Sequence, residues 1–169
     1  MGVLELIQQK SFLGKEFLTW LWFRAERDGR VEPRKSKPVT VELLGPILLD
    51  AQYGDARASM LKGESPATSP EARTALLEGK KLKKAKMKWT REDVEWIFTI
   101  DGENFNVSGL NVPNPGKLPF DDAMAVRMEM AREFETVLQL LLETFLERRM
   151  DAQGWGPEIK AIHEWLRTK

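Results

Sequence analysis

Hydrophobic residues near the start of the chain recur at three- and four-residue spacings, which is the pattern of an α-helix. The stretch from 17 to 23, FLTWLWF, is apolar on nearly every side of such a helix. A helix of this kind is buried on more than one face or lies at an interface. Ser11 is suited to cap its start, and Gly29 is suited to end it.

From residue 38 the pattern changes to the alternation of period two that is typical of half-buried strands. Residues 39–43, VTVEL, alternate clearly. Gly45 and Pro46 are expected to break this strand, because both residues interrupt regular pairing. Residues 47–49 are then expected to form a separate, returning strand.

The clearest alternation follows later in the chain and predicts an antiparallel meander over 85–110. Residues 90–93 form the expected hairpin loop between its first two strands, and a third strand starts near Phe105. The side chains predicted to face the core are those of Ala85, Met87, Trp89, Val94, Trp96, Phe98 and Ile100.

Three further helices are expected. A cap, a proline and an acid at 69–71 start a short one. Asp121 is expected to cap a long amphipathic helix over 123–149, and the glycines within 154–156 to separate it from a last short helix opened by Pro157. The fold class is therefore α+β: a central antiparallel sheet, about residues 38–110, packed against an N-terminal helix and a long C-terminal helix.

Length and composition narrow this picture. The 169 residues suit one domain, and the absence of cysteine excludes a disulfide framework or a thiolate metal site. Lys plus Arg and Asp plus Glu both number 26, which counts against a free-standing DNA-binding module unless cations cluster locally. No apolar run approaches the ~20 residues that span a bilayer, and the N-terminus lacks the basic region of a secretory signal. A cytoplasmic protein with no membrane partner is expected.

Lysines cluster at 80–88, where six occur within nine residues. On a strand, Lys84, Lys86 and Lys88 project from one face at a spacing of ~7 Å, which suits a phosphate backbone. The competing interpretation is a solvated strand face whose lysines keep a sheet edge from pairing, with the acids at 92–95 neutralising the row.

Other candidate residues favour structural roles. His163 is the only histidine and has no nucleophile or metal-ligand pattern around it, and Asp121 and Asp122 are interpreted as helix caps. Five of the six tryptophans are expected to pack in the core, and Trp155, between two glycines, is expected to be exposed. No catalytic residue, metal site or cofactor is predicted, so a non-enzymatic protein is expected.

A second basic group is interpreted as the polar end of the first helix and the loop after it. Cations near a helix C-terminus offset the helix dipole, so such a group needs no ligand to explain it. Its members are Arg24, Arg27, Arg30, Arg34, Lys35 and Lys37.

Several stretches carry a resemblance. Residues 12–23, FLGKEFLTWLWF, are followed at 76–89 by a helix, a Gly-Lys pair and an alternating strand that ends in Trp, then at 96–102 and 107–110 by a strand, a turn and a strand. This order is similar to that of the recombination-associated RdgC family. The resemblance covers most of this chain but only the C-terminal part of the family.

The resemblance implies duplex DNA binding without strong sequence preference, by dimers that form a ring and restrain a RecA-type recombinase. It predicts a non-catalytic, nucleoid-associated DNA-binding protein linked to recombination, and a homo-oligomer, expected as a dimer. The residues expected to bind DNA are Lys80, Lys81, Lys84, Lys86 and Lys88.

A second function class stays open: an oligomeric interaction or scaffold protein without nucleic-acid contact. The helix over 12–23 has more apolar surface than one amphipathic face hides. Self-association through this helix, or through the helix over 123–149, is therefore expected.

Overall fold

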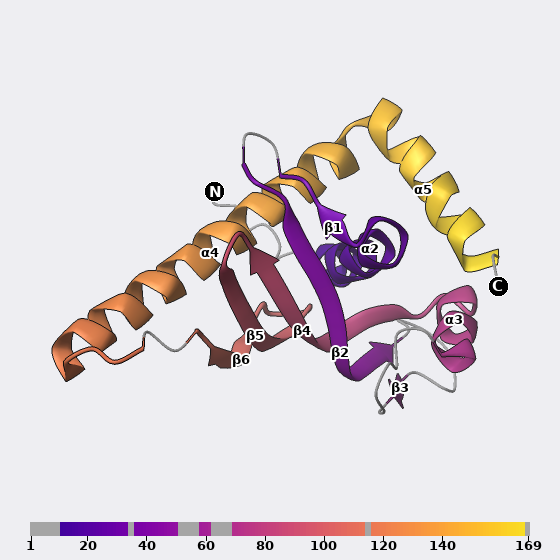
Figure 1. The fold of residues 1–169 in the computed structure, drawn as a ribbon. Helices are drawn as coiled ribbons and strands as arrows, with labels where there is room; N and C mark the ends of the chain where they lie inside the picture. The colour runs from indigo at the N-terminus through magenta and orange to yellow at the C-terminus, as the bar shows by residue number, and fades with distance from the viewer. Residues whose placement is uncertain (1–10, 34–35, 51–57, 62–68, 114–115, 168–169) are drawn as a thin grey trace.

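The computed structural model describes residues 11–33, 36–50, 58–61, 69–113 and 116–167. Within them an antiparallel sheet is covered by helices on one face, and the other face is open (Figure 1). The predicted fold class is confirmed: a central sheet packs against an N-terminal helix and a long C-terminal helix. No helix within the described residues has both the length and the apolar character needed to cross a membrane.

The sheet runs in the order β1-β2-β4-β5-β6, and β3 pairs with the far end of β2. Every pairing is antiparallel. The strands are β1 (Arg30–Val31), β2 (Val39–Asp50), β3 (Ala58–Leu61), β4 (Lys81–Arg91), β5 (Val94–Asp101) and β6 (Val107–Asn111).

The predicted break at Gly45 and Pro46 is wrong, because β2 continues through them as one strand. Its pairing with β4 shifts register between Leu43 and Ile47, so the two residues sit in a bulge. A bulge tolerates a proline, which has no N–H for the ladder, and Gly45 adopts a φ of +94° that favours glycine. The long partner strand holds both halves of β2 in one sheet.

The predicted hairpin is confirmed. In its register Trp89 lies opposite Trp96 and Met87 opposite Phe98, and all four side chains are buried on the helix-covered face. The turn is tighter than predicted, since pairing extends to Arg91.

Helix α2 (Ser11–Asp28) lies across the covered face of the sheet and supplies the centre of the core. Its hydrophobic side chains are buried on nearly every side of the helix, as its sequence requires. The buried members are Leu13, Phe17, Leu18, Trp20, Leu21, Trp22 and Phe23. Because this apolar surface is buried within the chain itself, it does not call for a partner at residues 13–23.

The remaining helices are α3 (Pro70–Leu77), α4 (Phe120–Met150) and α5 (Ala152–Arg167). The capping role of Ser69 in α3 is confirmed, because its hydroxyl accepts a hydrogen bond from the Ala72 N–H. The capping role of Asp121 is wrong: α4 begins at Phe120, so Asp121 lies within its first turn. There its charge still complements the helix dipole.

Helix α5 begins earlier than predicted. It includes the glycines that were expected to precede it, and Pro157 lies inside it. Asp151 supports the earlier start, because its side chain accepts a hydrogen bond from the N–H of Gln153 at 3.0 Å. Trp155 therefore sits in a helix rather than a loop. It is half-buried against Phe145, at 5.8 Å between ring centroids, so its predicted exposure is wrong.

Candidate functional site

The lysine row, defined as Lys84, Lys86 and Lys88, lies on the open face of the sheet. Along β4, the side chains of Ala85, Met87 and Trp89 are buried on the other face, as the alternation predicts. Lys84 and Lys86 are exposed and Lys88 is half-buried. The predicted common face of the three lysines is therefore present in the fold.

Carboxylates on the neighbouring strands partly neutralise this row. Lys88 contacts Glu42 of β2 at 2.8 Å, and the hydrogen bond and charge of Glu42 raise the pKa of Lys88. Asp101 of β5 lies opposite Lys84 in the ladder. Local sequence suggested acids at 92–95 for this role, and the charge of Glu95 does contribute to raising the pKa of Lys88. Glu42 was missed because it reaches the row only through the pairing of β2 with β4.

The structure does not bring Lys80 and Lys81 to the open face. Lys80 directly precedes β4 and is only 8% exposed, beside α3 and α5. Lys81 reaches Glu16 of α2 at 3.2 Å, and Arg149 of α4 reaches the same carboxylate at 2.8 Å. Both lysines were predicted to bind DNA because they belong to the run of six lysines at 80–88. The β-bulge at Lys83 separates their side chains from the row.

A second cationic surface is a hollow of about 530 Å³ where the end of α2, β1 and the last turns of α4 meet. Four arginines line it, and we call it the arginine hollow: Arg24, Arg27, Arg30 and Arg148. The first three belong to the basic group that was interpreted as a polar helix end. Arg34 and Lys35 of that group lie outside the described residues, and Lys37 pairs with Glu92.

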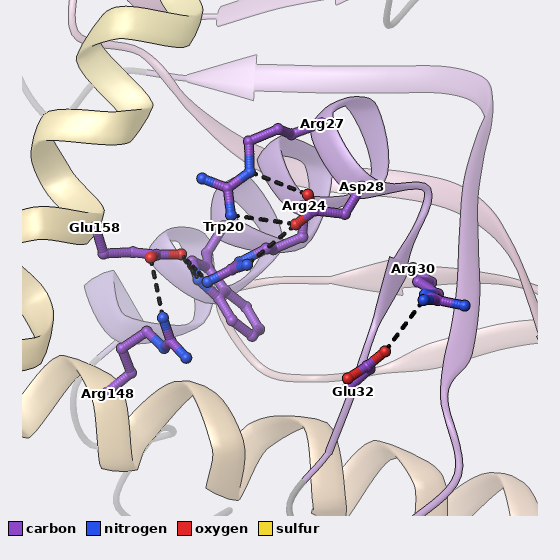
Figure 2. Close-up of polar contacts among 8 residues, drawn as sticks. All are labelled: Trp20, Arg24, Arg27, Asp28, Arg30, Glu32, Arg148 and Glu158. Atoms are coloured by element: carbon purple, nitrogen blue, oxygen red, sulfur yellow. Dashed lines mark hydrogen bonds and ion pairs between the residues drawn. The ribbon is translucent and has the colours of Figure 1, made fainter.

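A buried carboxylate on α5 forms ion pairs with two of these arginines. Glu158 of α5 is only 6% exposed at its side chain and contacts Arg24 at 2.7 Å and Arg148 at 3.2 Å. It also accepts a hydrogen bond from the Trp20 indole at 2.8 Å. Glu158 thus links α5 to α2 and α4, as Figure 2 shows. A buried charge requires such partners, because an unpaired carboxylate loses its hydration.

The rim of the hollow carries further ion pairs. Asp28 at the end of α2 accepts hydrogen bonds from Arg24 at 3.1 Å and from Arg27 at 3.2 Å. Burial opposes the charge of Asp28, but these hydrogen bonds outweigh it and lower the pKa of the carboxyl group. Arg30 pairs with Glu32 at 3.4 Å on the strand side, apart from the other arginines (Figure 2).

The single histidine and the acidic side chains of the described residues are the remaining candidates for a metal site. His163 lies exposed on α5. Within the described parts of the chain, His, Asp and Glu nowhere gather in a group of three that could hold a metal ion. Comparison of the chain with protein-family models, with curated proteins and with solved structures finds no match.

Proposed function

We propose that this protein binds duplex DNA with little sequence preference, through the lysine row on the open face of its sheet. The observation that carries the proposal is the placement of Lys84 and Lys86, both exposed, on a face that no described helix covers. Lysine ammonium groups contact phosphates as point charges, and such contacts carry no sequence information. The link to recombination rests on the resemblance of the sequence to the RdgC family.

The acidic side chains beside the lysine row should lower its affinity for DNA. Glu42 already contacts Lys88, and Asp101 lies opposite Lys84, so DNA has to compete with protein carboxylates. Binding should therefore be weak at physiological salt and should strengthen steeply as salt is lowered, because each phosphate contact releases counterions.

The test is a titration of labelled duplexes of unrelated sequence at several salt concentrations. The K84Q/K86Q variant should bind more weakly to all of them, and the slope of log K against log salt should fall by about two, roughly one per lost phosphate contact. Both side chains are exposed, so the fold should be retained.

The matched control is the K81Q/K83Q variant, which removes the same charge from the same strand. These two lysines pair with Glu16 and Glu103. The control should keep the parent's salt slope. An equal loss in both variants, or no binding by the parent at low salt, would rule out the row as the DNA contact.

A second candidate function, an oligomeric interaction protein, is favoured by α4. Its first turns project beyond the sheet (Figure 1), and its buried positions begin only at Phe134. Three large apolar side chains in the projecting part are exposed at successive turns: Phe120 by 73%, Met124 by 47% and Met128 by 54%. We call them the α4 stripe.

The occupant of this stripe that fits best is a second copy of the chain. The acids Asp121 and Asp122 lie at its start, and Arg127 and Arg132 lie further along the helix. Two copies packed antiparallel about Met124 would place Asp121 and Asp122 of each helix beside Arg127 of the other. The same arrangement covers both stripes at once, as a two-fold interface does.

A further inference from the structure

Compensation of helix dipoles does not explain all of the arginines in the arginine hollow. A cation in the last turn of a helix offsets the helix dipole, which accounts singly for Arg27 in α2 and Arg148 in α4. It does not account for Arg24, or for Arg30 on the strand side of the same hollow. Cations that line one hollow repel one another unless anions lie between them, and Asp28, Glu32 and Glu158 supply part of that compensation.

The carboxylates around the hollow neither neutralise all of its arginines nor occupy all of their hydrogen-bond donors. Four guanidinium groups share Asp28, Glu32 and Glu158, which leaves one positive charge. Each guanidinium has five N–H donors, and the contacts to these carboxylates use one or two per arginine. The Nε of Arg24 also lacks a hydrogen-bond partner among the described residues, but it is buried, so it is not one of the donors open to a ligand.

Two of the arginines are also held in place. Arg24 forms ion pairs with both Glu158 and Asp28. The Arg27 guanidinium lies over the Phe23 ring, 4.7 Å from the ring centroid. A guanidinium fixed in this way loses little freedom when it binds, so its remaining donors are suited to a ligand.

We propose that the arginine hollow binds the phosphate group of a small phosphate ester of about mononucleotide size. Guanidinium groups bind phosphate oxygens in pairs, and a phosphate offers more acceptors than a carboxylate does. The volume of about 530 Å³ lies within the range of roughly 300–1,000 Å³ that small-ligand pockets have. The lining is mainly charged, with Trp20 and Val31 as its apolar parts, which suits a compact anion better than a hydrophobic molecule.

The carboxylates at the rim should lower the affinity of the hollow for the ligand. Asp28 and Glu32 compete for the same donors that the phosphate uses. Removing Glu32 should therefore strengthen binding, whereas removing Arg30 should weaken it. Both side chains are exposed, so neither change should disturb the fold.

The experiment is calorimetric titration of the full chain with AMP and with inorganic phosphate, at constant ionic strength in a phosphate-free buffer, with adenosine as the uncharged comparison. The R27Q/R30Q variant should lose at least about tenfold in affinity for AMP, since each lost charge-assisted hydrogen bond contributes substantially. The E32Q variant should bind AMP more tightly than the parent. The K117Q/K160Q variant, which removes the same charge at two exposed positions that do not line the hollow, should match the parent.

Three results would overturn the proposal: no binding of AMP or phosphate at millimolar concentrations, equal binding of adenosine, or equal losses in R27Q/R30Q and K117Q/K160Q. Competition between AMP and a duplex oligonucleotide would identify the DNA backbone as the source of the phosphate, whereas AMP binding that persists with duplex present would identify a free phosphate ester. Either result supports the site. The lysine row takes no part in this proposal. A failure of the arginine hollow to bind phosphate can therefore be distinguished from a failure of the proposed DNA binding.

Discussion

At the scale of single residues, the backbone of α2 approaches the turn after β5 so closely that Gly14 leaves no room for a side chain. A Cβ added to Gly14 would lie 1.8 Å from the carbonyl oxygen of Gly102, which is backbone and cannot rotate away. Gly102 belongs to a turn signal in the sequence, but nothing local indicates that its backbone and that of Gly14 meet. Their contact follows from the way the helix lies across the sheet, and no pattern of spacing reports it.

This contact makes Gly14→Ala a test of the packing. Alanine favours a helix by about 1 kcal/mol over glycine, but the clash with Gly102 should outweigh this gain and destabilise the protein by about 1–3 kcal/mol or more. Gly156→Ala in α5 is the matched control, because its added Cβ meets no atom within 4 Å. That variant should be as stable as the parent or more so in urea unfolding. A neutral Gly14→Ala would mean that α2 does not pack on the turn as described.

At the scale of elements, sequence patterns predicted what local periodicity controls and missed what distant pairing controls. The alternation in β4 and β5 specified their faces, because side chains on a strand alternate whatever the strand pairs with. The continuity of β2 through Pro46 was missed, because it depends on pairing with β4. The arginine hollow was missed for a similar reason: Arg148 joins the α2 arginines only when α4 folds against them.

The Glu158 carboxylate links α5 to α2 and α4, which gives a prediction for this element. Glu158→Gln keeps the size of the side chain but leaves Arg24 and Arg148 without their shared negative charge. Breaking a buried pair costs about 3–5 kcal/mol, and the exposure of Arg148 should place this loss toward the low end, about 3 kcal/mol.

The measurement is urea unfolding, together with hydrogen exchange of the α5 amides. Exchange should rise first in α5, because its anchor is lost while the sheet keeps its own pairing. Glu164→Gln, an exposed position on the same helix, should change neither quantity. If both variants are equally stable, the carboxylate does not hold the helix.

At the scale of the whole molecule, the location of exposed apolar surface decides between routes of self-association. Sequence alone offered the first helix or the long one. The described part of α2 buries its large side chains in the chain's own core, so its composition no longer argues for a partner. The α4 stripe, in contrast, stays exposed on a projecting helix and continues the face that packs on the sheet from Phe134 onward.

We therefore predict that the chain dimerises through the α4 stripe and that M124K/M128K is monomeric. Two lysines in the apolar centre of a two-fold interface meet their own copies, so burial and like-charge repulsion both oppose association. Met150→Lys, which changes an equally exposed methionine at the other end of α4, should stay dimeric. Sedimentation equilibrium at high micromolar concentration measures all three proteins, and circular dichroism checks that each is folded. A monomeric parent at that concentration would exclude the interface, whereas a dimeric M124K/M128K would place it elsewhere on the molecule.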